Sequence, residues 1–203
     1  MRRAHGQSIP SSPRKSDSVE LEERLRTYLG ASGDPASLRA RGPALAWLVA
    51  HAKSAEPRLR ELLSPAAPAA PLLALDALVR IGSGASVPAI DALLREGNTE
   101  VSLAAARCLA DHPSPRAVTA LRKALRSNIG PAAISAVRVA SLRLGASCIP
   151  ALLVALESQD PDLRFHALRA VGLLGGISPA RIQSLASKDP DKDVRRLARE
   201  LSK

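Results

Sequence analysis

The chain has 203 residues and a mass of 21.3 kDa, enough for one domain with a buried core or for one array of repeats. It holds one Trp, one Tyr and one Phe, which argues against strand-rich sandwiches and base-stacking platforms. The net charge of +10 is compatible with nucleic-acid, acidic lipid or acidic protein partners and selects none of them. Because the apolar residues are chiefly Ala and Leu, both strong helix formers, the predicted fold class is all-α.

Residues 1–16 are rich in Ser, Pro and Arg and are expected to form a disordered basic tail. No apolar run follows their positive charges, so we do not expect a secretory signal. No later stretch approaches the roughly 20 apolar residues of a membrane span. A cytoplasmic protein without membrane association is therefore expected.

Residues 17–42 are predicted to form an N-terminal capping helix followed by turns. Asp17 and Glu20 fit a capping box, and Gly30 fits a helix end. Residues 33–35 and 42–43 combine Gly, Asp and Pro, which predicts turns at both places.

Residues 43–203 repeat with a step of 31. Alanine recurs in one register, at Ala74, Ala105, Ala136, Ala167 and Ala198. A second register is mostly proline, at Pro57, Pro88, Thr119, Pro150 and Pro179. A leucine follows each member of this second register by six residues, at Leu63, Leu94, Leu125, Leu156 and Leu185. Two registers locked together in this way predict a helical repeat.

Each unit contains two helical patterns separated by turn residues. The first helix begins with proline, whose missing N–H costs nothing there, and the second carries the recurrent alanine. A small residue is expected wherever two helix backbones approach closely. Because one helix pair cannot bury both of its apolar faces, about five pairs are predicted to stack into a short right-handed solenoid.

The unit spanning residues 157–185 carries a recognisable pattern: Asp160-Pro161, then Leu163-Arg164, then a helix of small residues and a Pro-Ala start. It resembles the bacterial HEAT-like repeat named after phycobilisome lyases, in the armadillo-like helical superfamily, and the resemblance covers about residues 43–203. Ser102 and Ala133 replace the repeat's usual arginine, so the Asp–Arg ladder typical of the family is expected to be broken in the middle. Members range from chromophore lyases to scaffolds, so the resemblance implies a fold rather than an activity.

Signals of catalysis, metal binding or cofactor binding are missing from the sequence. The four histidines are scattered without a partner at helical spacing, and no nucleophile elbow, Walker sequence or dinucleotide fingerprint occurs. Cys108 and Cys148 are expected to be buried apolar fillers. We therefore expect a non-enzymatic protein with no cofactor and no metal.

Arginine recurs two residues after the alanine register, at Arg107, Arg138 and Arg169. Two residues turn a helix by about 200°, which places these arginines opposite the packed alanines. In HEAT-like solenoids the second helix of each pair lines the concave face, so the resemblance implies a groove with a row of guanidinium groups. Aliphatic or aromatic residues two positions before each alanine would flank this row: Leu103, Ile134 and Phe165.

This groove is one of two interpretations, to which we give equal weight. Leu103, Ile134 and Phe165 could instead belong to the core between repeats, with the arginines solvated or paired. Between residues 101 and 156 seven cations face one anion, and three of them form a second basic patch on a first helix: Arg122, Lys123 and Arg126.

The leading functional prediction is a scaffold or adaptor that binds an acidic segment of a protein partner in the groove. The alternative is binding of nucleic acid through the basic surface, independent of base sequence. A third hypothesis, a chromophore-lyase-type subunit, follows from the resemblance alone.

Overall fold

The computed structural model describes residues 15–30, 34–63, 70–96, 98–127 and 130–203, and every regular element among them is helical. The chain divides into two compact units, residues 1–55 and 56–203, which we describe separately. The prediction of a disordered tail falls mostly on residues 1–14, outside the described residues. It is wrong for Lys15 and Ser16, which belong to the first helix.

The first unit is a pair of helices, α1 (Lys15–Leu29) and α2 (Pro35–Ala50). The apolar stripe of α1 is buried at Leu21, Leu25 and Tyr28, and α1 packs against α2. Gly30 follows the last residue of α1, as predicted, and its backbone N–H donates to the carbonyl of Arg26 at 2.8 Å.

The turn predicted at residues 42–43 is wrong, because α2 continues through it. The side chain of Asp34 caps this helix by accepting hydrogen bonds from the backbone N–H groups of Ala36 and Ser37. Pro43 removes one helical hydrogen bond, but Ala44 and Leu48 are completely buried on the same helix. Burial of this face therefore outweighs the local preference for a turn, and the domain boundary predicted at residue 43 lies inside a helix.

The helix α3 (Ala52–Glu61) crosses from the first unit into the second. The remaining elements, with one 3₁₀ turn η1, are α4 (Ala70–Ile81), α5 (Val87–Glu96), α6 (Thr99–Asp111), α7 (Pro115–Ser127), α8 (Gly130–Leu144), η1 (Gly145–Cys148), α9 (Ile149–Ala155), α10 (Pro161–Leu173), α11 (Pro179–Lys188) and α12 (Lys192–Leu201).

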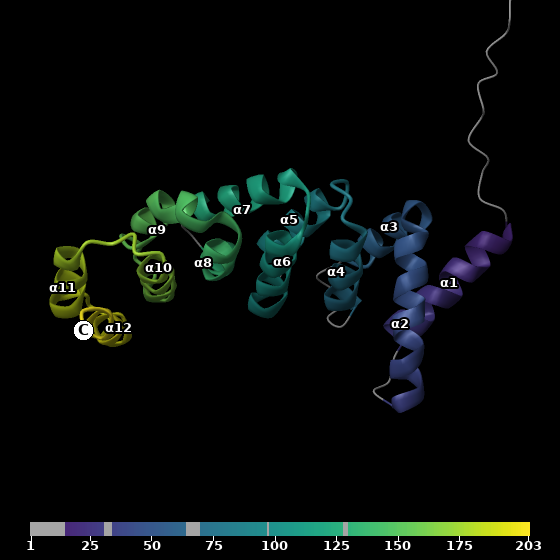
Figure 1. Ribbon diagram of the computed structural model, residues 1–203, viewed down its shortest axis with the longest axis horizontal. Helices are drawn as coiled ribbons and strands as arrows, with labels where there is room; N and C mark the ends of the chain where they lie inside the picture. Colours follow the sequence, from purple (N-terminus) through teal and green to yellow (C-terminus); the bar gives the residue numbers. More distant parts are fainter. Residues whose placement is uncertain (1–14, 31–33, 64–69, 97, 128–129) are drawn as a thin grey trace, which may run out of the picture. The chain divides into compact units, whose positions relative to one another are not determined.

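These helices form antiparallel pairs that stack in order. Packing within pairs joins α5 to α6, α7 to α8, α9 to α10 and α11 to α12. Packing between pairs runs along the second helices, from α4 through α6, α8 and α10 to α12, as the lower row of Figure 1 shows. We call the surface of these second helices the second-helix face, and the opposite surface, formed by α5, α7, α9 and α11, the first-helix face.

Both repeat registers are buried, which confirms the predicted helical repeat. The five alanines of the first register are at most 1% exposed, and all five leucines of the second register are buried. Pro179 begins α11 as expected, whereas Pro57 lies inside α3 rather than at its start. The repeat therefore follows the predicted pattern more closely toward its C-terminal end.

The last repeats are joined by a buried ion pair. Arg164 on α10 donates from Nη2 and Nε to the two carboxylate oxygens of Asp189, at 3.0 and 3.1 Å. Its remaining Nη1 donates to the backbone carbonyls of Ser158 and Gln159. Ser102 and Ala133, which stand at the matching positions of earlier repeats, are buried and carry no charge. The Asp–Arg ladder is thus broken in the middle of the second unit, as the sequence predicted.

One stretch, residues 132–155, does reach the length and hydropathy of a membrane span, contrary to the expectation from the sequence. It is not one helix, however. Gly145, with a φ of 51°, ends α8 in a left-handed conformation, and η1 intervenes before α9 begins. The stretch also contains Arg138 and Arg143, and both helices pack inside the stack. We therefore interpret it as two helices of consecutive repeats.

Replacing Ala136 by leucine should lower the free energy of unfolding by about 1–3 kcal/mol, because the site is enclosed and the added atoms must displace neighbours. Urea unfolding followed by circular dichroism measures this change. Ala180→Leu, at an exposed position on α11, is the matched control and should change stability by less than about 0.5 kcal/mol. Equal losses in the two variants would contradict close packing at Ala136.

Replacing Asp189 by alanine should cost about 3–5 kcal/mol of stability, because it leaves the Arg164 guanidinium buried without its counter-charge. The control is Arg196→Ala, which removes an exposed ion pair with Asp193 and should cost less than about 1 kcal/mol. The same unfolding assay compares them. A small loss in Asp189→Ala would show that the buried pair does not hold the last repeats together.

Candidate functional site

A buried Ser–His pair is the first group to test for catalysis. The Nδ1 of His112 accepts a hydrogen bond from the backbone N–H of Ser114 at 3.1 Å, so the proton of the neutral ring lies on Nε2. This Nε2 lies 3.4 Å from the hydroxyl oxygen of Ser86, whose own proton is donated to the carbonyl of Ser83. An activated serine needs a histidine that accepts its proton, and here the histidine is the donor. The pair therefore acts as a structural hydrogen-bond relay.

The two cysteines are free and buried. Burial raises the pKa of the Cys108 thiol to about 12, and it also raises the pKa of Cys148. Since the thiolate is the reactive form, both residues behave as the apolar fillers that the sequence predicted.

Two of the three predicted groove arginines line one pocket between α8 and α10. This pocket, which we call the Arg138–Arg169 pocket, has a volume of about 420 Å³. Its lining comes from the second-helix face: Val137, Arg138, Ser141, Leu142, His166, Arg169, Ala170 and Leu173.

The pocket combines unpaired positive charge with exposed aliphatic surface. Neither Arg138 nor Arg169 forms an ion pair or hydrogen bond with any other residue that the structure describes. At the rim stand Leu142 and Leu173, which are 80% and 77% exposed. Large apolar side chains that are exposed to this degree and line the same pocket as charged groups mark binding surfaces.

The pKa of His166 reflects the positive charge of the pocket. Its pKa is lowered below the ordinary value of 6.5, first by burial and then by the positive charges of Arg138 and Arg169, while Asp162 acts in the opposite direction. The ring atom Nδ1 is buried and has no hydrogen-bond partner among the described residues. The pocket is therefore a positively charged site in which a neutral imidazole is favoured.

Several other arginines of the second unit are paired with carboxylates. Arg181 pairs with Glu157, Arg95 with Asp91 and Arg80 with Asp76. A surface hollow between α9 and α11 includes Arg164 and Arg181, yet both have their carboxylate partners inside it. The Arg138–Arg169 pocket differs because no acidic residue lines it.

The other predicted groove residues are placed as follows. Arg107 is exposed on α6 but does not line the pocket. Leu103, Ile134 and Phe165 are half-buried. This intermediate burial does not decide between the two interpretations, an exposed groove and a core between repeats. Phe165 also packs edge-to-face against His166, with ring centroids 5.4 Å apart.

Sequence reasoning missed the two exposed leucines and His166 as parts of this site. A signal for the leucines was present: Leu142 and Leu173 are 31 residues apart, one helical turn after Arg138 and Arg169. Leucine at a repeat interval looks like core, however, and only the structure shows that these two are exposed.

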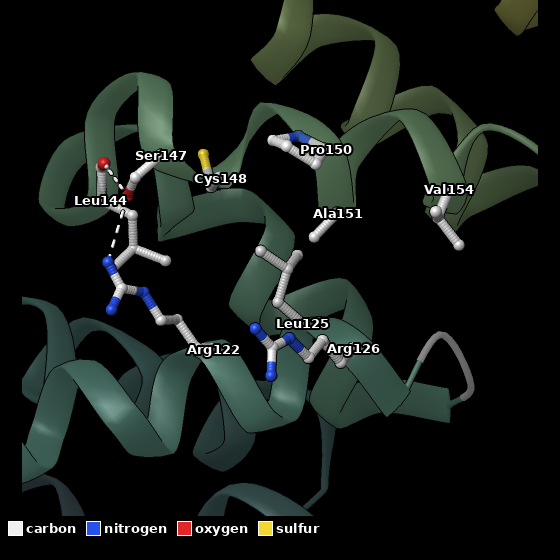
Figure 2. A pocket seen from close by; sticks show the side chains of 9 residues that line it. All are labelled: Arg122, Leu125, Arg126, Leu144, Ser147, Cys148, Pro150, Ala151 and Val154. Atoms are coloured by element: carbon white, nitrogen blue, oxygen red, sulfur yellow. Dashed lines mark hydrogen bonds between the residues drawn. The ribbon is translucent and has the colours of Figure 1, made fainter.

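The second basic patch lies on the first-helix face, with Arg122, Lys123 and Arg126 all exposed on α7. Arg122 and Arg126 line a separate pocket of about 330 Å³ between α7 and the η1–α9 segment, which Figure 2 shows. We call it the outer pocket. Among the described residues, no cluster of His, Cys, Asp or Glu side chains could hold a metal ion.

Comparison with known proteins supports the fold. Residues 55–143 match the family model of HEAT repeats. Together with the stacked helix pairs, this match shows that these residues form HEAT-like repeats. No curated protein matches the chain.

Among solved structures, the complex of CpcE and CpcF of phycocyanin lyase from Nostoc sp. PCC7120 is similar to this chain at 20% identity. The similarity covers 98% of this chain and 79% of that chain, with a TM-score of 0.44. At this level it says nothing about what the present chain binds or does.

Acidification from pH 7 to pH 5 should lower the free energy of unfolding, because His166 accepts a proton readily when unfolded and resists it when folded. The unfolded state then binds more protons, so stability falls as pH falls below the ordinary histidine pKa. His166→Asn should flatten this dependence, and the slope that remains is attributed to His112, whose pKa burial also lowers. Unfolding curves at several pH values test this, and an unchanged slope in the variant would contradict the role of His166.

Proposed function

We propose that the protein is a non-catalytic adaptor that binds an acidic, leucine-containing segment of a partner protein in the Arg138–Arg169 pocket. The observation that carries the proposal is the combination of two unpaired arginines and two exposed leucines around one pocket. HEAT repeats in general mediate protein interactions, and this fold presents its second helices as one continuous face.

The charge of the pocket selects the chemistry of the partner. Guanidinium groups bind carboxylates through two parallel hydrogen bonds, and Arg138 and Arg169 have no internal carboxylate to satisfy them. A partner segment with Asp or Glu side chains would supply these acceptors. Charge complementarity of this kind raises association rates and selects against basic partners.

The aliphatic rim supplies the apolar part of the interaction. Leu142 and Leu173 expose most of their side chains to water, so covering them removes apolar surface at a gain of about 25 cal/mol per Å². Apolar residues beside the acidic ones in the partner would cover these leucines. Val137 and Ala170 also line the pocket and are buried, so they hold the surrounding side chains in place.

Localisation in the cytoplasm remains part of this proposal. It rests on the interpretation of residues 132–155 as two stacked helices.

The experiment uses a fluorescein-labelled synthetic peptide rich in Glu and Leu, with fluorescence anisotropy as the readout. The full chain should bind it, and Arg138→Glu combined with Arg169→Glu should weaken binding by about tenfold or more, because the reversed charges repel the carboxylates. Adding Arg107→Glu tests whether the row of arginines extends to α6. Leu142→Asp should weaken binding as well, through the apolar rim.

The matched control is Arg122→Glu combined with Arg126→Glu, which makes the same change in net charge on the first-helix face. It should leave the affinity of the peptide within about twofold of the original. Equal losses in the two double variants would show that binding follows net charge rather than the pocket. Undiminished binding by the Arg138→Glu, Arg169→Glu variant, with native circular dichroism, would contradict the proposal directly.

A further inference from the structure

The outer pocket is a second concave site on the other side of the stack, and it shares no residue with the Arg138–Arg169 pocket. One wall is α7, which supplies Arg122, Leu125 and Arg126; the opposite wall is the η1–α9 segment (Figure 2). Because the two pockets are separate, a ligand of the outer pocket is independent of the proposed adaptor function.

The two arginines of the outer pocket stand one helical turn apart, at positions i and i+4 of α7. Like charges at this spacing destabilise a helix, and no acidic residue lines the pocket to offset them. Arg126 has no hydrogen bond or ion pair with another described residue. The site therefore carries two positive charges without a counter-charge.

One of the arginines is held in place by neutral groups only. Ser147 donates its hydroxyl proton to the carbonyl of Leu144 at 2.6 Å, which leaves its oxygen free to accept from Nη2 of Arg122 at 3.3 Å. Figure 2 shows Arg122 reaching from α7 toward this serine. The contact orients the guanidinium without neutralising it, so its other N–H groups stay available for a ligand.

The remaining lining of the pocket is apolar. Pro150, Ala151 and Val154 form one side of it, and Val154 is 59% exposed. A ligand that fits this lining carries a compact anion at one end and an apolar group at the other.

We propose that the outer pocket binds a phosphate monoester carried on an organic group. A phosphate monoester has a charge of about −1.5 to −2 at pH 7 and three acceptor oxygens, so it can neutralise two guanidinium groups at once. A carboxylate has only one charge, so it would neutralise one guanidinium and leave the pair of arginines with a net positive charge. The apolar side made by Pro150, Ala151 and Val154 contacts the organic part of the ester.

The test is isothermal titration of the full chain with phenyl phosphate at constant ionic strength. Phenyl phosphate should bind more tightly than inorganic phosphate, because its ring covers the apolar side, and more tightly than benzoate, which has the same ring and one charge. Arg122→Gln and Arg126→Gln should each weaken binding by about tenfold or more, the effect of losing a charged hydrogen bond.

The matched control is Arg116→Gln, which removes the same charge from an exposed position of α7 outside the pocket and should leave the affinity unchanged. An equal loss in this control would overturn the proposal, because it would show diffuse attraction to a basic helix. Benzoate binding as tightly as phenyl phosphate would also overturn it. The absence of phenyl phosphate binding would overturn it too. If the protein then still bound duplex DNA, the surface would be a site for polyanions.

Discussion

The structure depends on close approach between consecutive second helices, and alanine makes that approach possible. Each second helix from α4 to α12 places a completely buried alanine against its neighbours, so backbones can pack without a bulky side chain between them. The leucines of the second register, in or just after the first helices, are buried as well. The alanines and leucines of both registers are used for packing. The outward-facing positions of the second helices are therefore free to differ, and the binding chemistry lies there.

The charges of the second unit fall into two groups. Toward the C-terminal end Arg164, Arg181 and Arg196 have carboxylate partners, and Arg164 with Asp189 forms a buried bidentate pair that joins two repeats. In the middle of the stack the ladder position is uncharged, and the arginines of the two pockets have no carboxylate partner among the described residues. The four arginines that line the two pockets are thus without a counter-charge, which is the arrangement expected of surfaces that bind an anionic ligand.

The fold was predictable because a position that must be small or apolar in every unit recurs at the same step, so the repeat interval reveals the packing. Local signals were weaker where packing opposed them, as at Pro43, which lies inside a helix because the neighbouring face is buried. The site was predicted only in part. The sequence placed Arg138 and Arg169 on one face, but it could not show that Leu142 and Leu173 face water, because leucine at the repeat interval is equally typical of the core. Which arginines lack a partner also depends on contacts between repeats, which no local pattern reveals.

The central claim is that the unpaired arginines of the second-helix face bind a partner's carboxylates. The most direct measurement follows the Nε–H signals of the arginine side chains by NMR while the acidic, leucine-rich peptide is added. The signals of Arg138 and Arg169 should shift and saturate together, while Arg164, already satisfied by Asp189, stays unchanged. Equal shifts in all exposed arginines, or shifts that leave Arg138 and Arg169 out, would contradict the account.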